Sequence, residues 1–234
     1  SSVSPVMEKL IEAYKAVNAN ADIELQTTDS TTGMTSAIEG LCDIGMASRE
    51  LKEDEAAALA HQAIAMDGIA VIVNAENPVS DLTLEQIAKI YTGEITNWKD
   101  VGGNDAEIVL IGREAGSGTR DGFESITDTK DACQYRQELT STGDVITTVS
   151  QNPNAIGYAS LAAIKDSVKA LTVNGVAPTE ATVKDGTYKI QRPFVFVTND
   201  SAPLSEQAQA FFDFATSTDA ADLIRTAGAV PVNE

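Results

Sequence analysis

Gly112-Arg113-Glu114-Ala115-Gly116-Ser117-Gly118-Thr119-Arg120 is the most informative segment of the sequence. It follows an apolar segment at residues 108–111, which predicts a strand, and it opens a segment at residues 117–126 that predicts a helix. Glycines let backbone N–H groups come close to a ligand, and the start of a helix carries a partial positive charge. Arg113 can grip two oxygens of a tetrahedral anion, and Ser117 and Thr119 add hydroxyl donors. The stretch therefore predicts an oxyanion site, although a plain strand-to-helix turn capped by Ser117 would have the same sequence.

Three other hydroxyl-bearing stretches repeat this arrangement. Ser1-Ser2-Val3-Ser4-Pro5 stands at the start of a helix predicted at residues 5–17, with Ser4 as a candidate N-cap. Ser30-Thr31-Thr32-Gly33 stands before the next predicted helix, and Ser48 follows a strand predicted at residues 42–46. Helix capping explains each stretch when it is considered alone. However, loops that follow parallel strands lie together at the edge of an open α/β sheet where ligands bind, so these stretches can converge on one ligand. The predicted anion-binding residues are Ser1, Ser2, Ser30, Ser48, Arg113, Ser117, Gly118 and Thr119.

The order of the predicted elements indicates an α/β protein with two lobes. Strands at residues 23–25, 42–46 and 63–73 alternate with helices, and a second cycle begins after Pro78. Extended crossings near residues 72–76 and 192–196 suggest that the chain leaves one lobe and later returns to it. We therefore expect a discontinuous first lobe of residues 1–74 plus 195–234 and an inserted second lobe of residues 75–194. Each lobe is expected to contain a mainly parallel sheet, with a hinge near Val73 and residues 193–195.

Composition narrows the class of partner. The chain has 234 residues, 43% of them hydrophobic, and its 16 Lys and Arg against 35 Asp and Glu give a net charge of −19. Nucleic acids and anionic membranes need a basic footprint, so neither is an expected partner. The net charge does not exclude a small anion as ligand. The field of distant carboxylates is screened over about 8 Å, so a buried site is governed mainly by its nearest groups. No apolar run approaches the ~20 residues of a membrane span, and the abrupt start is typical of a processed chain.

Residues that would serve an enzyme are few. No Lys follows the glycines as in a Walker A loop, and Gly116-Ser117-Gly118 lacks the outer glycines of a nucleophile elbow. His61, the only histidine, is expected to be structural or exposed. Asp54 and Glu55 are expected to be solvated rather than to bind magnesium. A phosphate-handling enzyme is therefore a weaker alternative, a purely structural surface domain is a third, and no catalytic residue, metal or cofactor is predicted.

The two cysteines, Cys42 and Cys133, form neither a Cys-x-x-Cys motif nor a zinc-binding pattern. They fall in different predicted lobes, where a disulfide would clamp the hinge. We therefore expect two free, mostly buried thiols.

Seven stretches occur in one order from the first residues to the last. They are Ser1-Ser2-Val3-Ser4-Pro5, Asp43-Ile44-Gly45-Met46-Ala47-Ser48-Arg49-Glu50-Leu51, Ile90-Tyr91-Thr92-Gly93-Glu94-Ile95-Thr96-Asn97-Trp98, Arg113 with Gly116-Ser117-Gly118-Thr119-Arg120, Asn154-Ala155-Ile156-Gly157-Tyr158, Arg192-Pro193 and Ala227-Gly228-Ala229-Val230-Pro231. In this order they resemble the phosphate-specific substrate-binding proteins of ABC importers. The resemblance implies a periplasmic-binding-protein fold of the second topological type. It also implies a monomeric extracytoplasmic receptor, often a lipoprotein, that captures inorganic phosphate for an ABC transporter permease and catalyses nothing.

The resemblance also assigns roles to residues. Ser1, Ser2 and Ser30 match the family's ligand-binding serines of the first two loops. Arg113, Ser117, Gly118 and Thr119 match its phosphate-gripping loop. The family's first strand, signal segment and anchor cysteine fall outside this chain.

Two departures from the family concern discrimination between anions. Ser48-Arg49 stands where many members have an Asp that accepts the proton of monohydrogen phosphate, so Ser48 is expected to be a donor. Ala115 stands where a carboxylate usually braces the arginine, and Glu114 or Asp29 can replace it. Another tetrahedral oxyanion, such as sulfate or molybdate, is therefore an alternative ligand.

Overall fold

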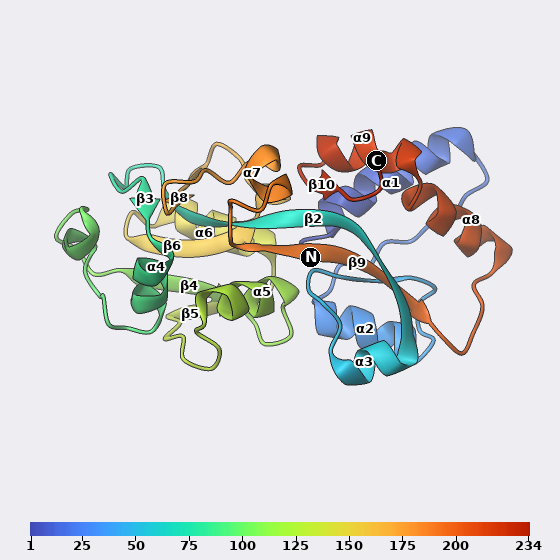
Figure 1. Cartoon of the computed structure of the whole chain (residues 1–234), viewed down its shortest axis with the longest axis horizontal. Coiled ribbons are helices and arrows are strands. Elements are labelled where there is room, and N and C mark those ends of the chain that lie inside the picture. Colours follow the sequence, from blue (N-terminus) through green and yellow to red (C-terminus); the bar gives the residue numbers. More distant parts are fainter.

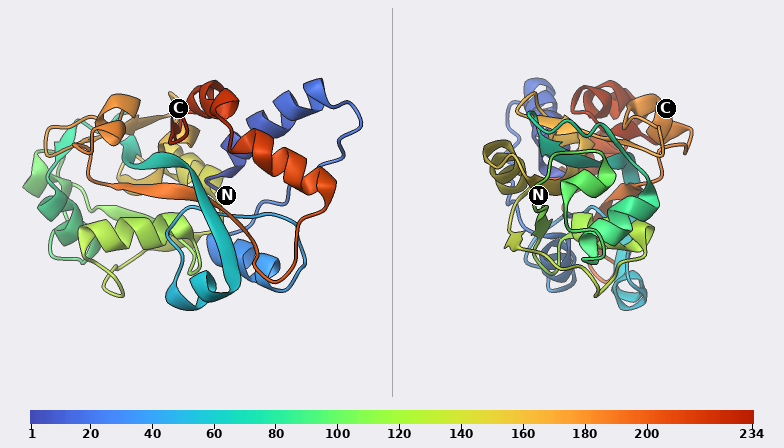
Figure 2. Two further views of the ribbon diagram at one scale, coloured as in Figure 1. Left: turned by 45° about the vertical axis from the view of Figure 1, so that its right-hand side comes forward. Right: turned by 90° about the vertical axis from the view of Figure 1, so that its left-hand side faces the viewer.

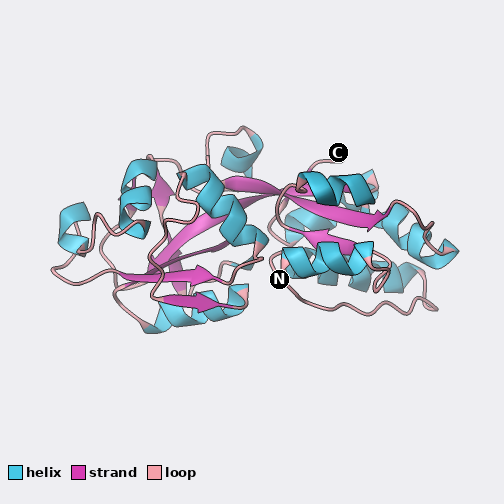
Figure 3. Ribbon diagram, turned by 90° about the horizontal axis from the view of Figure 1, so that it is seen from below, coloured by secondary structure: helices cyan, strands magenta, loops and turns pink.

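Two long strands join two groups of helices and strands in this computed structural model, which describes residues 1–234 (Figure 1). The long strands are β2 (Leu59–Asn74) and β9 (Gln191–Asn199), and they pair in antiparallel fashion along most of β9. Helices lie on both sides of the strands in each group (Figure 3). The predicted two-lobed α/β fold is therefore confirmed.

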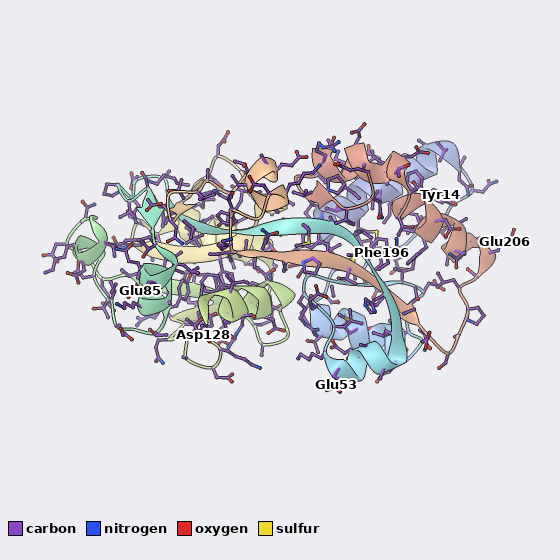
Figure 4. All side chains as sticks on the ribbon, viewed as in Figure 1. Tyr14, Glu53, Glu85, Asp128, Phe196 and Glu206 are labelled. Carbon is purple, nitrogen blue, oxygen red and sulfur yellow. The ribbon has the colours of Figure 1, made fainter.

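The first lobe lies on the right of Figure 1 and contains the first and the last secondary-structure elements of the chain. Its elements, besides parts of β2 and β9, are α1 (Ser4–Val17), α2 (Ser30–Ile38), β1 (Gly45–Ala47), α3 (Glu53–Ala58), α8 (Glu206–Ala215), η3 (Thr218–Ala220), α9 (Ala221–Thr226) and β10 (Val230–Pro231). Helices α1 and α8 lie side by side (Figure 2), and the Tyr14 ring meets the Phe211 ring edge-on at 5.4 Å. Tyr14 and Phe196, both labelled in Figure 4, belong to one buried cluster that forms the core of this lobe.

The second lobe lies on the left of Figure 1. Its elements are β3 (Asp81–Leu82), α4 (Leu84–Tyr91), η1 (Trp98–Val101), β4 (Val109–Arg113), α5 (Gly118–Thr127), β5 (Gln137–Leu139), α6 (Thr142–Gln151), β6 (Ala155–Ser160), η2 (Leu161–Ala163), β7 (Val168–Ala170), β8 (Thr172–Val173) and α7 (Glu180–Lys184). Its core is a separate buried cluster built around Tyr91, Trp98, Phe123 and Tyr158. Two distinct cores give each lobe its own source of hydrophobic stabilisation.

Strand β2 belongs to both lobes because it changes partners along its length. Up to Gly68 it pairs with β9, and from Ile69 onward it pairs with β6 and β7. The buried clusters divide at the same place, since Ala65 packs in the first core and Ile69 in the second. Val71 and Ile72 face different clusters, so both faces of the strand are covered, which explains the nearly continuous apolar run. Strand β2 therefore changes its pairing partner at Gly68 and Ile69, a few residues before Val73, where we predicted that the chain crosses between the lobes.

The strand directions differ from the mainly parallel sheets that we predicted. The strands in the main sheet are ordered β1-β9-β2-β6-β4-β5, and β7 and β10 also pair with β2. Only β4 with β5, β4 with β6, and β3 with β8 are parallel pairs. The reason is that β2 carries the chain out to the second lobe and β9 carries it back. These two strands are antiparallel to each other, and β1, β6, β7 and β10 pair directly with them.

The strand predicted at residues 23–25 is not formed. These residues lie outside every helix and strand, because no neighbouring strand pairs with them. A cavity of about 910 Å³ is lined by Ile23 and Leu25 from this segment, by Met46 of β1, and by Met7 and Phe211 of the adjacent helices. The apolar pattern of the segment is therefore explained by its contact with this cavity and the helices rather than by a sheet.

Three smaller expectations also need correction or completion. The N-cap position of α1 is Val3, and Ser4 is instead the first helical residue, with its hydroxyl 2.9 Å from that of Thr27. Both cysteines are free as predicted, but Cys42 is exposed and Cys133 is only half-buried, because the loop after α2 carries Cys42 to the surface. None of the helices combines the length and the apolar character that crossing a membrane requires.

Candidate anion-binding site

Four helices begin between the two lobes: α1 and α2 from the first lobe, and α5 and α6 from the second. Ser117 caps α5 by accepting a hydrogen bond from the Arg120 amide at 3.2 Å, and Ser141 caps α6 in the same way. Asp29 caps α2 by accepting from the Thr32 amide at 2.9 Å. The first amides of a helix have no partner within it and carry a partial positive charge. Helix starts that are brought together in this way form an environment suited to an anion.

A chain of four hydroxyl groups connects the starts of α1, α5 and α6. The oxygen of Ser2 lies 2.6 Å from that of Thr119 and 3.2 Å from that of Thr142. The Ser1 oxygen lies 3.0 Å from that of Thr142. Ser2, Thr119 and Thr142 are all buried. Because a hydroxyl can donate as well as accept, this chain offers several donors within a few ångströms of each other.

A second group of hydroxyls lies on the other side of the start of α5. The Ser48 amide donates to the Ser30 oxygen at 2.9 Å, and the two side-chain oxygens are 3.3 Å apart. A Cβ placed on Gly118 would lie 2.3 Å from the Ser30 oxygen and 2.7 Å from that of Ser48. Glycine at this position therefore lets the two serines of the first lobe reach the backbone of the second.

Arg113 supplies a guanidinium beside the hydroxyl chain. Its side chain is buried, and NH1 donates to the Thr142 oxygen at 3.2 Å. Glu114 braces it through two bonds, from Nε at 2.8 Å and from NH2 at 2.9 Å. Glu114 is thus the replacement for the missing carboxylate at Ala115, whereas Asp29, the other candidate, caps α2 instead. Bidentate pairing of this kind fixes the plane of the guanidinium.

The lobes also touch each other outside the hydroxyl groups. Thr31 of α2 donates both its amide and its hydroxyl to the Gly116 carbonyl, each at 3.2 Å. Arg49, which follows β1, places Nε 3.2 Å from an Asp121 carboxylate oxygen on α5. These contacts join the two lobes, and they help to explain why nearly all the predicted site residues are buried.

Glu55 corrects one sequence-based expectation. Predicted to be solvated, it is buried and binds Arg49 through two hydrogen bonds of 2.7 Å. Hydrogen bonding to Arg49 keeps the pKa of the Glu55 carboxyl below its usual value. Glu55 therefore serves as the anchor of the interlobe arginine rather than as a surface charge.

The eight predicted residues all lie around the start of α5, and two further residues join them. Thr142 was missed although Ser141-Thr142-Gly143 repeats the hydroxyl and glycine pattern of the other helix starts. Arg192 was noted only within Arg192-Pro193, yet its NH2 donates to the Thr119 oxygen at 2.8 Å. An arginine inside an apolar strand requires a buried partner, and this requirement is a signal that the sequence contained.

Two buried arginines supply positive charge to the site although the whole chain is acidic. Arg113 donates to Thr142, and Arg192 donates to Thr119. No three His, Cys, Asp or Glu side chains are grouped so that they could hold a metal ion, and His61 is exposed on β2. The arrangement supplies donors and positive charge, which are what a desolvated oxyanion needs.

Two lobes that close around a buried, donor-rich site define a ligand-binding protein of the periplasmic type, and a family model described as a PBP superfamily domain matches residues 1–219. The phosphate-binding protein PstS of Borreliella burgdorferi is 32% identical over 97% of this chain and 86% of its own length. PstS of Bacillus subtilis is 32% identical over the whole chain and 79% of its own length. The chain belongs to the PstS family of this superfamily.

Solved structures agree with this assignment. A phosphate ABC transporter substrate-binding protein of Clostridium perfringens, solved with bound phosphate, is 43% identical and superimposes with a TM-score of 0.95 over 99% of this chain and 96% of that one. An ABC-type phosphate transport receptor of Vibrio cholerae is 36% identical, with a TM-score of 0.80 over 98% of this chain and 96% of that one. The resemblance inferred from the seven motifs is therefore confirmed along the whole chain.

Proposed function

We propose that the protein captures inorganic phosphate between its lobes and delivers it to the membrane permease of an ABC transporter. The observation that carries the proposal is the convergence of eight predicted residues and Thr142 around the start of α5, with Arg113 as a buried cation. The names of the relatives support phosphate as the ligand, and the Clostridium perfringens protein was solved with phosphate bound. We assign phosphate binding to Ser1, Ser2, Ser30, Ser48, Arg113, Ser117, Gly118, Thr119 and Thr142.

Discrimination between phosphate and sulfate depends on an acceptor for the proton that only phosphate carries at neutral pH. The carboxylates nearest the site are already engaged, since Glu114 binds Arg113 and Asp29 binds Thr32. Ser30 accepts from the Ser48 amide, whereas the Ser48 hydroxyl has no contact other than Ser30. Ser48 is therefore the hydroxyl most free to accept as well as donate. We propose that its oxygen accepts a hydrogen bond from the protonated oxygen of phosphate, and that sulfate and molybdate bind more weakly.

Binding is proposed to close the lobes about β2 and β9. Our predicted lobes are residues 1–74 plus 195–234 and residues 75–194, and the change of partner at Gly68 and Ile69 favours a hinge slightly earlier in β2. Phosphate that contacts serines of one lobe and Arg113 of the other would favour the closed state. The closed form would then be the one that the permease recognises.

The other features of the proposal follow from family membership. We propose that the protein acts outside the cytoplasm as a monomer, anchored as a lipoprotein, with neither a metal nor a cofactor and without catalysis. A phosphate-handling enzyme is the disfavoured alternative, because the hydroxyls of the site have no histidine within their hydrogen-bonding network.

Titration calorimetry with phosphate tests the proposal, with micromolar affinity or better expected, about −8 kcal/mol. Arg113→Gln should weaken binding by a factor of about 100 or more, because the anion loses charge-assisted donors in a desolvated site. Arg136→Gln is the matched control, since Arg136 is an exposed arginine of the same lobe. Absence of heat and of thermal stabilisation at millimolar phosphate would falsify the proposal.

Competition by sulfate, arsenate and molybdate across pH then tests the role given to Ser48.

A further inference from the structure

Asp67 and Arg192 form a buried ion pair where the chain passes between the lobes. They face each other in register on β2 and β9, next to the change of partner at Gly68 and Ile69. Asp67 is completely buried and Arg192 is 4% exposed, and NH1 lies 2.8 Å from a carboxylate oxygen. Two opposite charges are thus embedded in otherwise apolar strands.

The Arg192 side chain leaves the hinge and reaches the site. Its guanidinium lies over the Phe194 ring at 5.2 Å, and its stem passes close to Gly122, where an added Cβ would meet it at 3.4 Å. Its NH2 donates to the Thr119 oxygen at 2.8 Å, and Thr119 in turn contacts Ser2. A single side chain therefore links the hinge strands to the hydroxyl chain.

The direction of these hydrogen bonds follows from the chemistry of the groups. A guanidinium only donates, so Arg192 occupies a lone pair of Thr119 and Arg113 does the same to Thr142. Because Thr119 and Thr142 both accept from cations, their hydroxyl protons are directed to Ser2, to Ser1 or to an anion beside them. An oxygen that accepts from a cation is also a stronger donor.

A purely structural role explains the pair less well. Although NH1 lies 2.8 Å from Asp67, the contact is poorly aligned, and neither Asp67 oxygen nor Arg192 Nε or NH1 makes a well-formed hydrogen bond. Burial raises the pKa of the Asp67 carboxyl to about 6 in spite of the neighbouring Arg192. A buried pair that lacks its full set of hydrogen bonds contributes little to stability compared with apolar side chains. The one well-formed bond of the guanidinium is the one to Thr119.

We infer that Arg192 is the second cation of the anion site and that it acts as a positioning residue, held by Asp67 and orienting the Thr119 hydroxyl toward the ligand. This inference rests on the proposed function. It adds to that function a link between the hinge strands and the ligand through Arg192.

A double-mutant cycle on phosphate affinity tests the inference. Thr119→Val removes the hydroxyl and keeps the shape, while Arg192→Lys keeps the charge and removes the planar fork. Arg192→Lys should lower phosphate affinity about tenfold in the wild-type background and less than about twofold in the Thr119→Val background. An equal effect in both backgrounds, or no effect at all, overturns the inference. Lys169→Met is the control, because Lys169 is a partly buried cation on β7, which pairs with β2. The phosphate affinity of this variant should equal that of the wild type.

A second variant separates binding from folding. Asp67→Leu with Arg192→Met replaces the ion pair by apolar side chains, an exchange that cores tolerate. Without phosphate, this variant should unfold at the same temperature as the wild type. Its phosphate affinity should fall at least about tenfold, to the level of Thr119→Val. A folded double variant with wild-type affinity contradicts the inference. If the wild-type protein itself does not bind phosphate, the proposed function fails instead.

Discussion

The side-chain oxygens of Ser2 and Thr119 lie 2.6 Å apart, although the two residues belong to different lobes and are separated by 117 positions in the chain. Such proximity requires that the starts of α1 and α5 face each other across the cleft. It also means that either hydroxyl can reach the same ligand atom. The predictions that follow depend on this convergence.

Gly118→Ala should obstruct the site without harming the fold. The new methyl group would lie 2.3 Å from the Ser30 oxygen, which is too close for a closed cleft. Overpacking of this size costs about 1–3 kcal/mol, so phosphate affinity should fall by a factor of about 5 to 150. Calorimetry measures the loss, and thermal unfolding without phosphate should be unchanged or slightly raised, because alanine favours a helix.

Gly143→Ala is the matched control for this substitution. Gly143 also lies in the first turn of a helix at the cleft, but the nearest atom to an added Cβ is the Ser141 oxygen at 3.9 Å. Phosphate affinity should be unchanged in this variant. A similar loss in both variants would show that the effect arises from the helix and not from closure of the cleft.

Asp121→Asn should weaken closure through the loss of an interlobe ion pair. Its carboxylate contacts Arg49 at 3.2 Å, and its side chain is 39% exposed, so the pair is partly screened by solvent. The expected loss of phosphate affinity is at most about fivefold, and it should shrink as salt is raised. Binding titrations at low and high salt measure this, with exposed Asp166→Asn as the control. A loss that is independent of salt would contradict an electrostatic cause.

Glu55→Gln should change the dependence of stability on pH. Because Arg49 keeps the pKa of Glu55 below its unfolded value of 4.5, the ionised carboxylate stabilises the fold above that pH. This contribution is lost as the pH falls through the lower, folded-state pKa. The variant should be about 2 kcal/mol less stable than the wild type at neutral pH, and the gap should narrow in acid.

Denaturant unfolding across pH measures the contribution of Glu55. Glu53→Gln serves as its control, since Glu53 lies in the first turn of the same helix and is exposed. This change should cost no more than about 0.5 kcal/mol. A constant gap between wild type and Glu55→Gln at every pH would count against the ion pair.

Thiol labelling should distinguish the two cysteines. Both are free, and Cys42 is exposed whereas Cys133 is half-buried and donates to Thr129. A maleimide should therefore modify Cys42 first in the native protein, and Cys42→Ser should remove the fast phase. Burial raises the pKa of both thiols, so labelling should accelerate as the pH rises above neutrality. Equal rates at the two positions would contradict the exposure described here.

Local chemistry in the sequence predicted most of the residues that converge on the start of α5. The stretch from Gly112 to Arg120 showed a strand, a glycine-rich turn and a helix start, and each feature has a physical cause that acts within a few residues. Convergence of the serine-bearing loops could be inferred because strand ends share a sheet edge. Thr142 carried the same local signal and was overlooked.

Long-range pairing could not be predicted in the same way. Strand direction depends on which strands become neighbours, and all four strands that pair with β2 run antiparallel to it. The predicted strand at residues 23–25 had a suitable apolar pattern but no neighbour to pair with. Glu55 and Arg49 are six positions apart, and their pairing depends on how α3 folds back on the segment after β1.

Strand β2 contributes to the cores of both lobes without a break, and this has a consequence for unfolding. If one lobe lost its structure, the other would lose part of its central strand, so neither can persist alone. Chemical denaturation should therefore follow a single cooperative transition, and the amides of Ile69 to Val73 should exchange with solvent among the slowest in the chain.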